Sequence, residues 1–344
     1  MQQLSDTNSN SAAGPVAVIG AGSWGTALAV LLAQQGHCVR LWGRNADAIS
    51  EMASVRKNLR YLPDTELPQS LLPTADLQAA IADVDDVLVV VPSHAFAQCV
   101  ASLAKIRPNL PTLAWATKGF EPETGRFLDD IVVDHYGREC ARALLSGPTF
   151  AGEVARGLPT AVTLAGNSDA FTQQWARRFH GSNLRVYTST DLIGVQVAGG
   201  VKNVLAVAAG IADGLGFGSN TRAALITRGL AELTRLGLRL GGRLETFSGL
   251  AALGDLVLTC SDDQSRNRRF GLALAAGASV DEALARVGQV VEGLRNTREV
   301  KQLAQRNGIE MPIAEQVYRV LFEHCPPREA VDALLARELK VEAD

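Results

Sequence analysis

The sequence predicts an α/β protein in which a doubly wound, mostly parallel sheet is followed by an all-helical C-terminal domain. Three observations support this fold class. Short apolar, β-branched runs alternate with helical patterns through the first half of the chain, which is typical of a parallel sheet covered by helices. A glycine-rich turn follows the first of these runs. From about residue 190 helical patterns replace the strand patterns, and 344 residues are enough for two domains.

Each predicted strand is a short run of aliphatic residues bounded by polar residues or glycine. The run from Asp86 to Val91 is apolar on both faces, as expected of a buried parallel strand. Pro73 confines a weaker run to the sheet edge, because proline cannot donate to a strand ladder. The predicted strands are 16–20, 38–42, 71–75, 86–91, 112–116, 143–146, 160–165 and 184–187, and the last two are expected to close the domain.

The second half reads as helices, with the main patterns at 195–212, 221–238, 272–276, 280–285, 296–307 and 313–322. Its most apolar stretch, from Val204 to Ala212, is too short to cross a bilayer, which takes about 20 apolar residues. We therefore expect no membrane insertion. The predicted division is a disordered polar tail at 1–14, a sheet domain at 15–190 and a helical domain at 191–344.

The composition excludes several classes of function. Hydrophobic residues make up 47% of the chain, charged residues make up 20%, and the net charge is −3. No large basic surface is expected, so nucleic acid is not a predicted partner. The five cysteines are widely spaced and form no CxxC pair, which argues against disulfides and a metal site. The N-terminal segment lacks the basic and apolar regions of a signal peptide, and we expect a cytoplasmic protein.

A GxGxxG pattern runs from Gly20 to Gly25. The pattern alone is a weak signal, but here it follows a predicted strand and opens a helix, the context of a Rossmann-type dinucleotide site. Gly20 would form the tight turn, Gly22 would let a pyrophosphate approach the backbone, and Gly25 would let the helix pack on the strand. Free N–H groups at the helix start would bind the phosphates. The alternative is a purely structural glycine turn.

Arg44 stands where the second strand ends, a position at which enzymes specific for NAD usually carry Asp or Glu. An arginine can stack on adenine and pair with a 2′-phosphate. The sequence therefore predicts that NADP(H) is accepted as well as NAD(H). The alternative is a solvated surface arginine.

Three further segments follow predicted strands, at the sheet edge where ligands of open α/β sheets bind. One contains His94, a weak candidate for a general base, since a lone histidine at a strand end is more often structural. The second contains Lys118, one of six lysines and a suitable partner for an anionic substrate. The third runs from Ser146 to Ala151.

Two ionisable residues interrupt apolar helical patterns in the second half. Lys202 either extends to solvent or faces a cleft, where burial would lower its pKa and suit it to proton transfer. The apolar surroundings favour the cleft. Asp255 either pairs with Lys202 or caps the segment that follows it. A polar and basic tract, 261–271, precedes a predicted helix and is either a phosphate cradle or a solvated loop.

Together these segments resemble the bacterial NAD(P)-dependent glycerol-3-phosphate dehydrogenase family, from about residue 15 to 335. The motifs that carry the resemblance are GAGSWGTALA, TKGFE, SGPTFAGEVARGLPTA, GGVKNVLAVAAGIADGLGFGSNTRAAL, ALGDL, TCSDDQSRNRRFG and VVEG. The resemblance implies that Lys202 is the general acid/base and that Asp255 orients it. It implies substrate contacts by Lys118, Gly147, Thr149, Lys202, Asp255, Ser265, Arg266 and Asn267, and cofactor contacts by Gly20, Gly22, Ser23, Trp24, Gly25, Arg44, Lys118, Ala151, Arg266, Val290 and Glu292.

The function implied by the resemblance is hydride transfer between sn-glycerol 3-phosphate and dihydroxyacetone phosphate with NAD(H) or NADP(H), which supplies glycerol 3-phosphate for phospholipid synthesis. Many relatives carry histidine in place of Arg44, and this departure strengthens the expectation of NADP(H). The alternatives are a related dehydrogenase of a 3-hydroxy acid, 6-phosphogluconate or ketopantoate, and a non-catalytic nucleotide sensor. A homodimer is expected, since cyclic dimers are the commonest oligomers.

Overall fold

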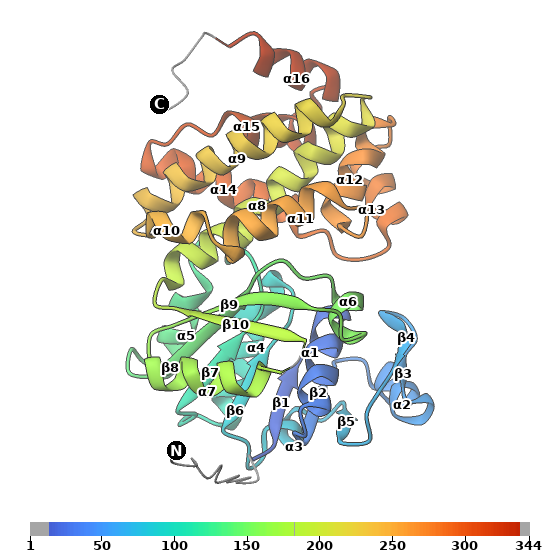
Figure 1. Cartoon of the computed structure of the whole chain (residues 1–344), viewed down its shortest axis with the longest axis vertical. Coiled ribbons are helices and arrows are strands. Elements are labelled where there is room, and N and C mark those ends of the chain that lie inside the picture. Colours follow the sequence, from blue (N-terminus) through green and yellow to red (C-terminus); the bar gives the residue numbers. More distant parts are fainter. Residues whose placement is uncertain (1–13, 182, 338–344) are drawn as a thin grey trace, which may run out of the picture.

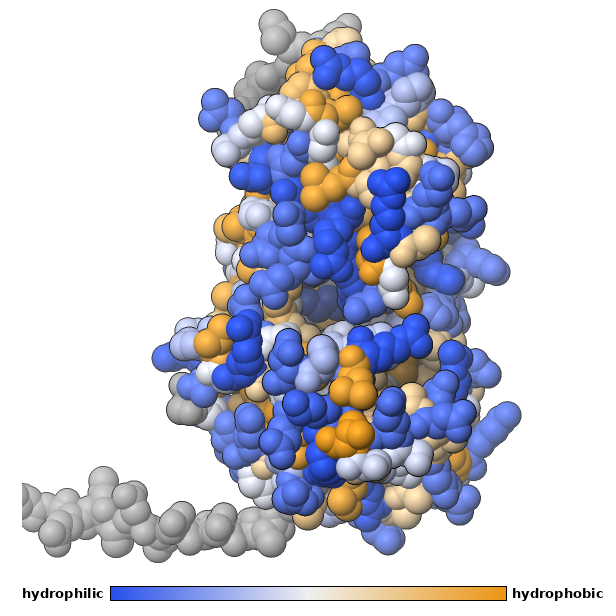
Figure 2. Space-filling model, turned by 90° about the vertical axis from the view of Figure 1, so that its right-hand side faces the viewer, coloured by the Kyte–Doolittle hydropathy of each residue, from blue (hydrophilic) through white to orange (hydrophobic). Residues whose placement is uncertain are grey.

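The computed structural model describes residues 14–181 and 183–337. All but the last residue of the predicted tail 1–14 lies outside the described residues. A sheet lobe and a helical lobe are stacked along the long axis of the molecule (Figure 1). Seen from the side, the surface is hollowed between the two lobes, and mostly hydrophilic residues surround the hollow (Figure 2).

The sheet lobe is built on eight strands in the order β10-β9-β8-β7-β6-β1-β2-β5. All neighbours are parallel except β8 and β9, which are antiparallel. The predicted α/β class is confirmed, and Pro73 lies on the edge strand β5. The strands are β1 (Val16–Ile19), β2 (Val39–Trp42), β5 (Leu71–Thr74), β6 (Asp86–Val89), β7 (Thr112–Trp115), β8 (Ala141–Ser146), β9 (Thr160–Gly166) and β10 (Leu184–Ser189).

Both faces of this sheet are buried, as the apolar strand patterns predict. Along β1, Val16 and Val18 join one hydrophobic cluster, while Ala17 and Ile19 join the cluster on the opposite face. The covering helices are α1 (Ser23–Gln34), α2 (Ala46–Val55), α3 (Leu77–Ile81), α4 (Ser93–Ile106), α5 (Leu128–Tyr136), α6 (Ala151–Ala155) and α7 (Asp169–Phe179).

A small hairpin that the sequence patterns do not predict lies beside α1 and is formed by β3 (Lys57–Asn58) and β4 (Leu62–Glu66). Asn58 from this hairpin donates to the carbonyl oxygen of Ala21 at 3.0 Å and to Thr26 Oγ1 at 2.8 Å. The hairpin therefore holds the start of α1 in place. Its strands are too short, and too rich in polar residues, to give a strand pattern.

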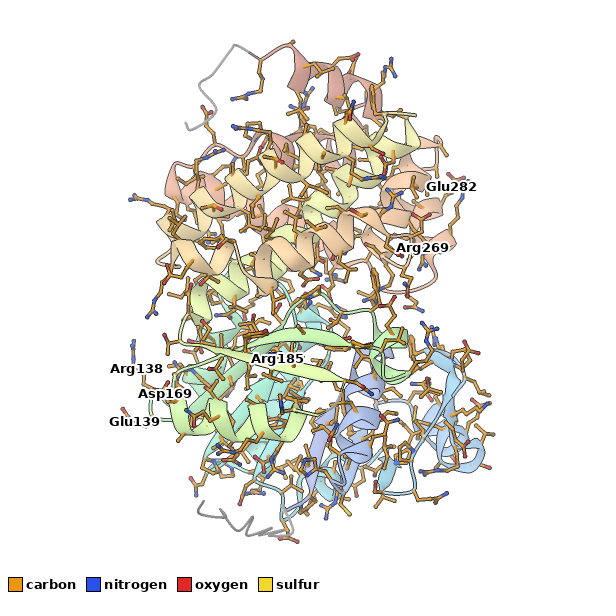
Figure 3. All side chains as sticks on the ribbon, in the orientation of Figure 1. Arg138, Glu139, Asp169, Arg185, Arg269 and Glu282 are labelled. Carbon is orange, nitrogen blue, oxygen red and sulfur yellow. The ribbon has the colours of Figure 1, made fainter. Side chains whose placement is uncertain are left out.

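The sheet edge opposite β5 is β10, on which Arg185 lies over the ring of Tyr187 at 5.3 Å from the ring centroid. Figure 3 marks Arg185 on this strand, and Arg138, Glu139 and Asp169 near the same side of the sheet lobe. Charged side chains on an edge strand discourage pairing with a second sheet.

The helical lobe surrounds one long helix, α8 (Leu192–Gly214). By length and composition this helix could cross a membrane, and it extends beyond the apolar stretch 204–212 that the sequence pattern marks as too short to do so. However, 94% of its most apolar window is buried inside the protein, as in the core helix of a soluble protein. The other elements are α9 (Ser219–Arg239), α10 (Leu244–Phe247), a π-helical turn (Leu250–Gly254), α11 (Asp255–Ser261), α12 (Arg266–Ala275), α13 (Val280–Val287), α14 (Glu292–Asn307), α15 (Pro312–Phe322) and α16 (Pro327–Leu335).

Two glycines bring α8 and α12 into backbone contact. A Cβ at Gly210 would lie 2.1 Å from the carbonyl oxygen of Arg268, and a Cβ at Gly271 would lie 2.2 Å from that of Val207. These distances leave no room for any side chain. The close approach places the start of α12 against the middle of α8, where Lys202 and Asn203 are found.

Candidate active site

The glycine turn after β1 has the geometry that its motif requires. Gly20 has a φ of +126°, and a Cβ there would lie 2.4 Å from the carbonyl oxygen of Val90. A Cβ at Gly25 would lie 1.8 Å from the carbonyl oxygen of Gly20. A Cβ at Gly22, in contrast, would have no atom of the described residues within 4 Å. Two of the glycines are thus needed by the fold, whereas Gly22 faces open space.

The start of α1 is suited to bind an anion. Gly22 occupies the N-cap position, and no side chain caps the helix, which begins at Ser23. The first N–H groups of a helix are free of intrahelical partners and carry the positive end of its dipole. A side chain at Gly22 would fill the space in front of them. The residues present therefore fit the pyrophosphate of a dinucleotide.

Trp24 and Ala151 come together beside this turn. Both pack against a small cluster formed by Ala27, Leu62 and Ala155. The indole nitrogen of Trp24 is buried and has no hydrogen-bond partner among the described residues. Arg44 is exposed in the loop that follows β2, and no hydrogen bond or ion pair holds it within the described chain.

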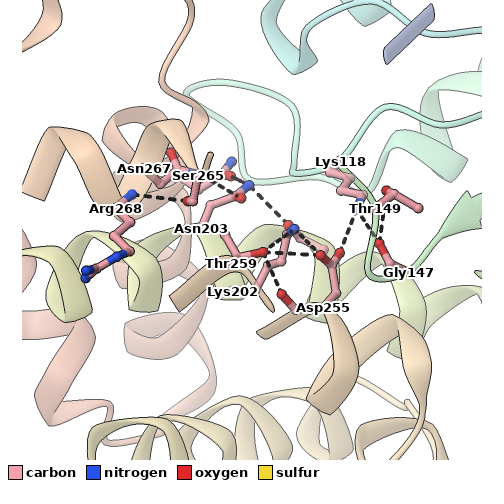
Figure 4. A network of polar contacts seen from close by, with 12 residues as sticks. Lys118, Gly147, Thr149, Lys202, Asn203, Asp255, Thr259, Ser265, Asn267 and Arg268 are labelled. Carbon is pink, nitrogen blue, oxygen red and sulfur yellow. Dashed lines mark hydrogen bonds and ion pairs between the residues drawn. The ribbon is translucent and has the colours of Figure 1, made fainter. Parts of the chain in front are cut away.

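At the junction of the lobes, Asp255 bridges two lysines (Figure 4). Its Oδ1 lies 2.5 Å from Lys202 Nζ on α8, and its Oδ2 lies 2.6 Å from Lys118 Nζ, which follows β7. Lys202 also donates to Thr259 Oγ1 at 3.0 Å. Asp255 begins α11, but its carboxylate pairs with lysines from both lobes and forms no cap.

The pKa values of both Lys202 and Asp255 are lowered, but for different reasons. Burial is the largest influence on Lys202 and lowers its pKa to about 8, aided by the nearby charge of Lys118 and opposed by Asp255. Burial would raise the pKa of Asp255, but the two lysines outweigh it and hold the pKa below its usual value. The cluster therefore carries one net positive charge when both lysines are protonated. Lys202 is poised to exchange a proton near neutral pH.

The two glycines before Lys202 let the Lys118 loop pack on α8. A Cβ at Gly199 would lie 3.5 Å from the Cβ of Lys118, and one at Gly200 would lie 2.3 Å from the ring of Phe120. Small residues at these positions allow the two lysines to approach the same carboxylate.

The segment after β8 completes this side of the site. Gly147 has a φ of +150°, and its carbonyl oxygen accepts from Lys118 Nζ and from Thr149 Oγ1, both at 3.2 Å. Next to it, Ser146 Oγ is buried and has no partner among the described residues. Lys118, Gly147 and Thr149 are therefore brought together, as the resemblance implies.

The polar tract predicted as a phosphate cradle begins a helix. Ser265 is the N-cap of α12, and its Oγ accepts from the backbone N–H of Arg268 at 3.2 Å. Arg266 is exposed at the first position of the helix. Asn267 is buried, and its Nδ2 donates to Asn203 Oδ1 at 2.9 Å. The cradle and the lysine cluster therefore meet on α8, where Lys202 and Asn203 are adjacent.

Glu292 joins the two lobes. It begins α14, and its two carboxylate oxygens accept from the backbone N–H of Ser93 at 3.2 Å and from Ser93 Oγ at 2.7 Å, at the start of α4. Val290 is exposed just before it. His94 is also exposed and forms no hydrogen bond with the lysine cluster among the described residues.

Sequence reasoning missed Thr259 and Asn296. Thr259 contacts Lys202, and its position four residues after Asp255 in a helix was the available signal. Asn296 accepts from Asn203 Nδ2 at 2.9 Å, and nothing in the sequence pointed to this contact. Within 14–181 and 183–337, no group of three or more His, Cys, Asp or Glu residues could hold a metal ion.

A dinucleotide-type turn on a doubly wound sheet and a buried lysine–aspartate pair contributed by a helical lobe define a two-domain NAD(P)-dependent dehydrogenase. Two family models divide the chain between them. The model for the N-terminus of NAD-dependent glycerol-3-phosphate dehydrogenase matches residues 15–172, and that for its C-terminus matches residues 191–332. The chain belongs to this family.

Individual proteins agree with this assignment. The chain is 56% identical to the glycerol-3-phosphate dehydrogenase [NAD(P)+] of Pseudoalteromonas translucida, covering 97% of this chain and 100% of that protein. It is also 56% identical to the enzyme of that name from Thioalkalivibrio sulfidiphilus, over 95% of this chain and 98% of that one. The crystal structure of glycerol-3-phosphate dehydrogenase from Coxiella burnetii superposes with a TM-score of 0.92 at 49% identity, covering 94% and 99% of the chains. The alternative dehydrogenases and the sensor are not favoured by these matches.

Proposed function

We propose that the protein interconverts sn-glycerol 3-phosphate and dihydroxyacetone phosphate with NAD(H) or NADP(H) as cofactor. The observation that carries the proposal is the buried array of Lys202, Asp255 and Lys118 at the junction of the two lobes. Its net positive charge suits an anionic substrate, and its lysine of lowered pKa suits proton transfer to and from an oxygen. The glycerol-3-phosphate activity of the relatives named above supports the choice of substrate.

The nicotinamide of the bound cofactor supplies or accepts the hydride. The residues of this chain position the substrate and transfer the proton. Lys202 uses two of its three N–H bonds on Asp255 and Thr259, which leaves the third for the substrate oxygen. During ketone reduction, the ammonium form donates a proton as negative charge grows on that oxygen. During alcohol oxidation, the neutral amine accepts the proton.

Asp255 is proposed to hold Lys202 in place and to stabilise its ammonium form. The phosphate of the substrate is proposed to lie at the start of α12, where Ser265, Arg266 and Asn267 present donors beside free backbone N–H groups. The remaining proposed contacts are Lys118, Gly147 and Thr149 for the substrate, and Gly20, Gly22, Ser23, Trp24, Gly25, Arg44, Lys118, Ala151, Arg266, Val290 and Glu292 for the cofactor.

The test is to follow the nicotinamide absorbance of the purified protein with dihydroxyacetone phosphate and either NADPH or NADH. Rapid oxidation of at least one cofactor is expected. If both cofactors bind but neither is oxidised, the proposed substrate is wrong. Ketopantoate and 3-hydroxy acids would then be tested in the same assay.

Three broader features belong to the same proposal. We propose a domain boundary near residue 190, and the connection between the end of β10 at Ser189 and the start of α8 at Leu192 supports it. The protein is proposed to be a cytoplasmic homodimer, and its five free cysteines suit a reducing compartment. Sedimentation velocity would measure the oligomeric state. Glycerol 3-phosphate formed by the enzyme would supply phospholipid synthesis.

A further inference from the structure

Behind the proposed phosphate site, a chain of three buried side-chain amides ends at a buried glutamate. Asn267 donates to Asn203 at 2.9 Å, Asn203 donates to Asn296 Oδ1 at 2.9 Å, and Asn296 Nδ2 donates to Glu299 Oε2 at 3.3 Å. The four side chains come from three helices, namely α12, α8 and α14. None of them is more than 8% exposed.

The two ends of this chain determine its direction. At one end the backbone N–H of Gly293, which can only donate, points to Asn267 Oδ1 at 2.9 Å. At the other end a carboxyl oxygen of Glu299 accepts. An amide whose oxygen accepts from one neighbour must turn its NH₂ group toward the next. Reversing any of the three amides would place two donors or two acceptors in contact.

This direction decides what Asn267 offers to a ligand. One N–H of Asn267 Nδ2 is used on Asn203, and the second has no acceptor within the described chain. Both N–H bonds of Asn203 Nδ2 are used, on Asn296 Oδ1 and on the carbonyl oxygen of Gly199 at 3.2 Å. Asn296 Nδ2 likewise uses one N–H bond, on Glu299, but Asn296 is fully buried whereas Asn267 is 8% exposed. Of the two amides with an N–H bond to spare, Asn267 is therefore the one at the start of α12, where the phosphate is proposed to bind.

The same chain also contacts the loop that carries Lys118. Gly119 has a φ of +112°, and a Cβ there would lie 2.7 Å from Asn296 Nδ2. Asn296 thus packs directly against the residue next to Lys118. Displacing Asn296 would disturb the lysine loop from the sheet lobe and the asparagines from the helical lobe together.

We propose that Glu299, acting through Asn296, is a positioning residue that orients Asn203 and Asn267 for the phosphate-bearing end of the substrate. Glu299 does not contact the substrate in this arrangement. Burial raises its pKa to about 7, and either protonation state keeps a carboxyl oxygen that accepts from Asn296. The inference rests on the proposed function, because it takes the substrate phosphate to lie at Asn267.

The main test replaces Glu299 by an apolar residue of similar size. Glu299→Leu removes the acceptor and frees Asn296 to turn. We expect KM for dihydroxyacetone phosphate to rise about tenfold, which corresponds to about 1.4 kcal/mol. The value of kcat should change by less than about threefold, which is under about 0.7 kcal/mol. Glu299→Gln keeps an amide oxygen that accepts from Asn296, so this variant should stay close to the wild type. Calorimetric titration with glycerol 3-phosphate should show the same loss of affinity without turnover.

Glu232 provides a matched control. It is also a glutamate that is 3% exposed in the helical lobe, but it accepts from the backbone N–H groups of Ile313 and Ala314 at the start of α15. Glu232→Leu should lower the melting temperature and leave KM unchanged. If Glu299→Leu folds with an unchanged KM, or if both leucine variants raise KM equally, the positioning role is wrong.

Asn296→Ala tests the same chain if Glu299→Leu does not fold. It should raise KM by a similar factor, because it also breaks the chain of hydrogen bonds between Glu299 and Asn203. An unchanged KM in Asn296→Ala would also overturn the inference. Failure of the proposed function is distinguishable, since the wild type itself would then not oxidise NADH or NADPH with dihydroxyacetone phosphate.

Discussion

The two lobes build their shares of the candidate site from different kinds of atoms. The sheet lobe contributes mainly backbone, in the glycine turn at Gly20 to Gly25 and the carbonyl oxygen of Gly147. The helical lobe contributes buried side chains, above all Lys202 and Asp255. A backbone site is damaged by adding atoms, whereas a side-chain site is damaged by removing them. The two halves should therefore respond to opposite kinds of substitution.

The largest effect is expected from removing the amine of Lys202. Lys202→Met should lower kcat by about 10²–10⁴-fold, the usual contribution of general acid–base catalysis. Asp255 keeps its ion pair with Lys118 in this variant, so the fold should survive. Steady-state kinetics with dihydroxyacetone phosphate would measure the loss.

Lys301→Met is a suitable control for this substitution, because Lys301 lies in the same lobe and pairs with Glu315 at 2.9 Å. It should keep wild-type activity. Retention of more than about a tenth of kcat by Lys202→Met would contradict the assignment of Lys202 as the acid/base.

The next effect concerns the backbone site and separates two glycines. Gly22→Ala adds a methyl group in open space, so the melting temperature should be unchanged. The affinity for the cofactor should fall at least about tenfold, which corresponds to about 1.4 kcal/mol. Gly25→Ala forces a contact with the carbonyl oxygen of Gly20 and should lower the melting temperature itself. Calorimetric titration with NADPH and thermal denaturation would compare the two variants. Equal loss of stability in both would show that Gly22 also serves the fold.

A smaller and more selective effect is expected at Arg44, a proposed cofactor contact of the sheet lobe that depends on side-chain charge. Arg44→Ala should lower kcat/KM for NADPH about tenfold, since hydrogen bonds to charged groups contribute about 1.5–3 kcal/mol. The value for NADH should change little, because NADH lacks the 2′-phosphate. Equal efficiency with both cofactors, unchanged by the substitution, would show that Arg44 is only a solvated surface residue.

The last effect is on stability alone and involves no proposed substrate or cofactor contact, so no change in activity is expected from it. Burial raises the pKa of Glu232 to about 7, above its ordinary value of 4.5. The folded state therefore binds this proton more tightly than the unfolded state, and stability should fall as pH rises from about 4.5 to 7, by on the order of 3 kcal/mol at most. Glu232→Gln should remove this decline, and urea unfolding at several pH values would measure it. A parallel pH dependence in wild type and variant would assign the effect to other groups.

The fold class and the glycine turn could be predicted because both depend on local patterns. Apolar runs that alternate with helical patterns indicate a sheet buried on both faces. The spacing of Gly20, Gly22 and Gly25 indicates a turn within one βα unit. The sequence also predicted that Lys202 faces a buried site. A lysine within a helix of Val, Ala and Gly is rarely buried unless it has a partner there. Two elements with weaker sequence patterns were not predicted correctly. The β3–β4 hairpin is too short to show alternation, and the helix α12 begins at Arg266, well before the predicted 272.

Contacts between distant segments were decided only by the tertiary structure. Asp255 lies 53 residues from Lys202 and 137 from Lys118, yet one carboxylate binds both. Asn203 and Asn296 are 93 residues apart, and Ser93 and Glu292 are 199 residues apart. A hydrogen bond needs its atoms within about 3 Å, whereas periodicity reports only which face of an element is buried. The packing of α8 against α12 and the Lys118 loop, made possible by small residues, brings these side chains to the distances at which they can act.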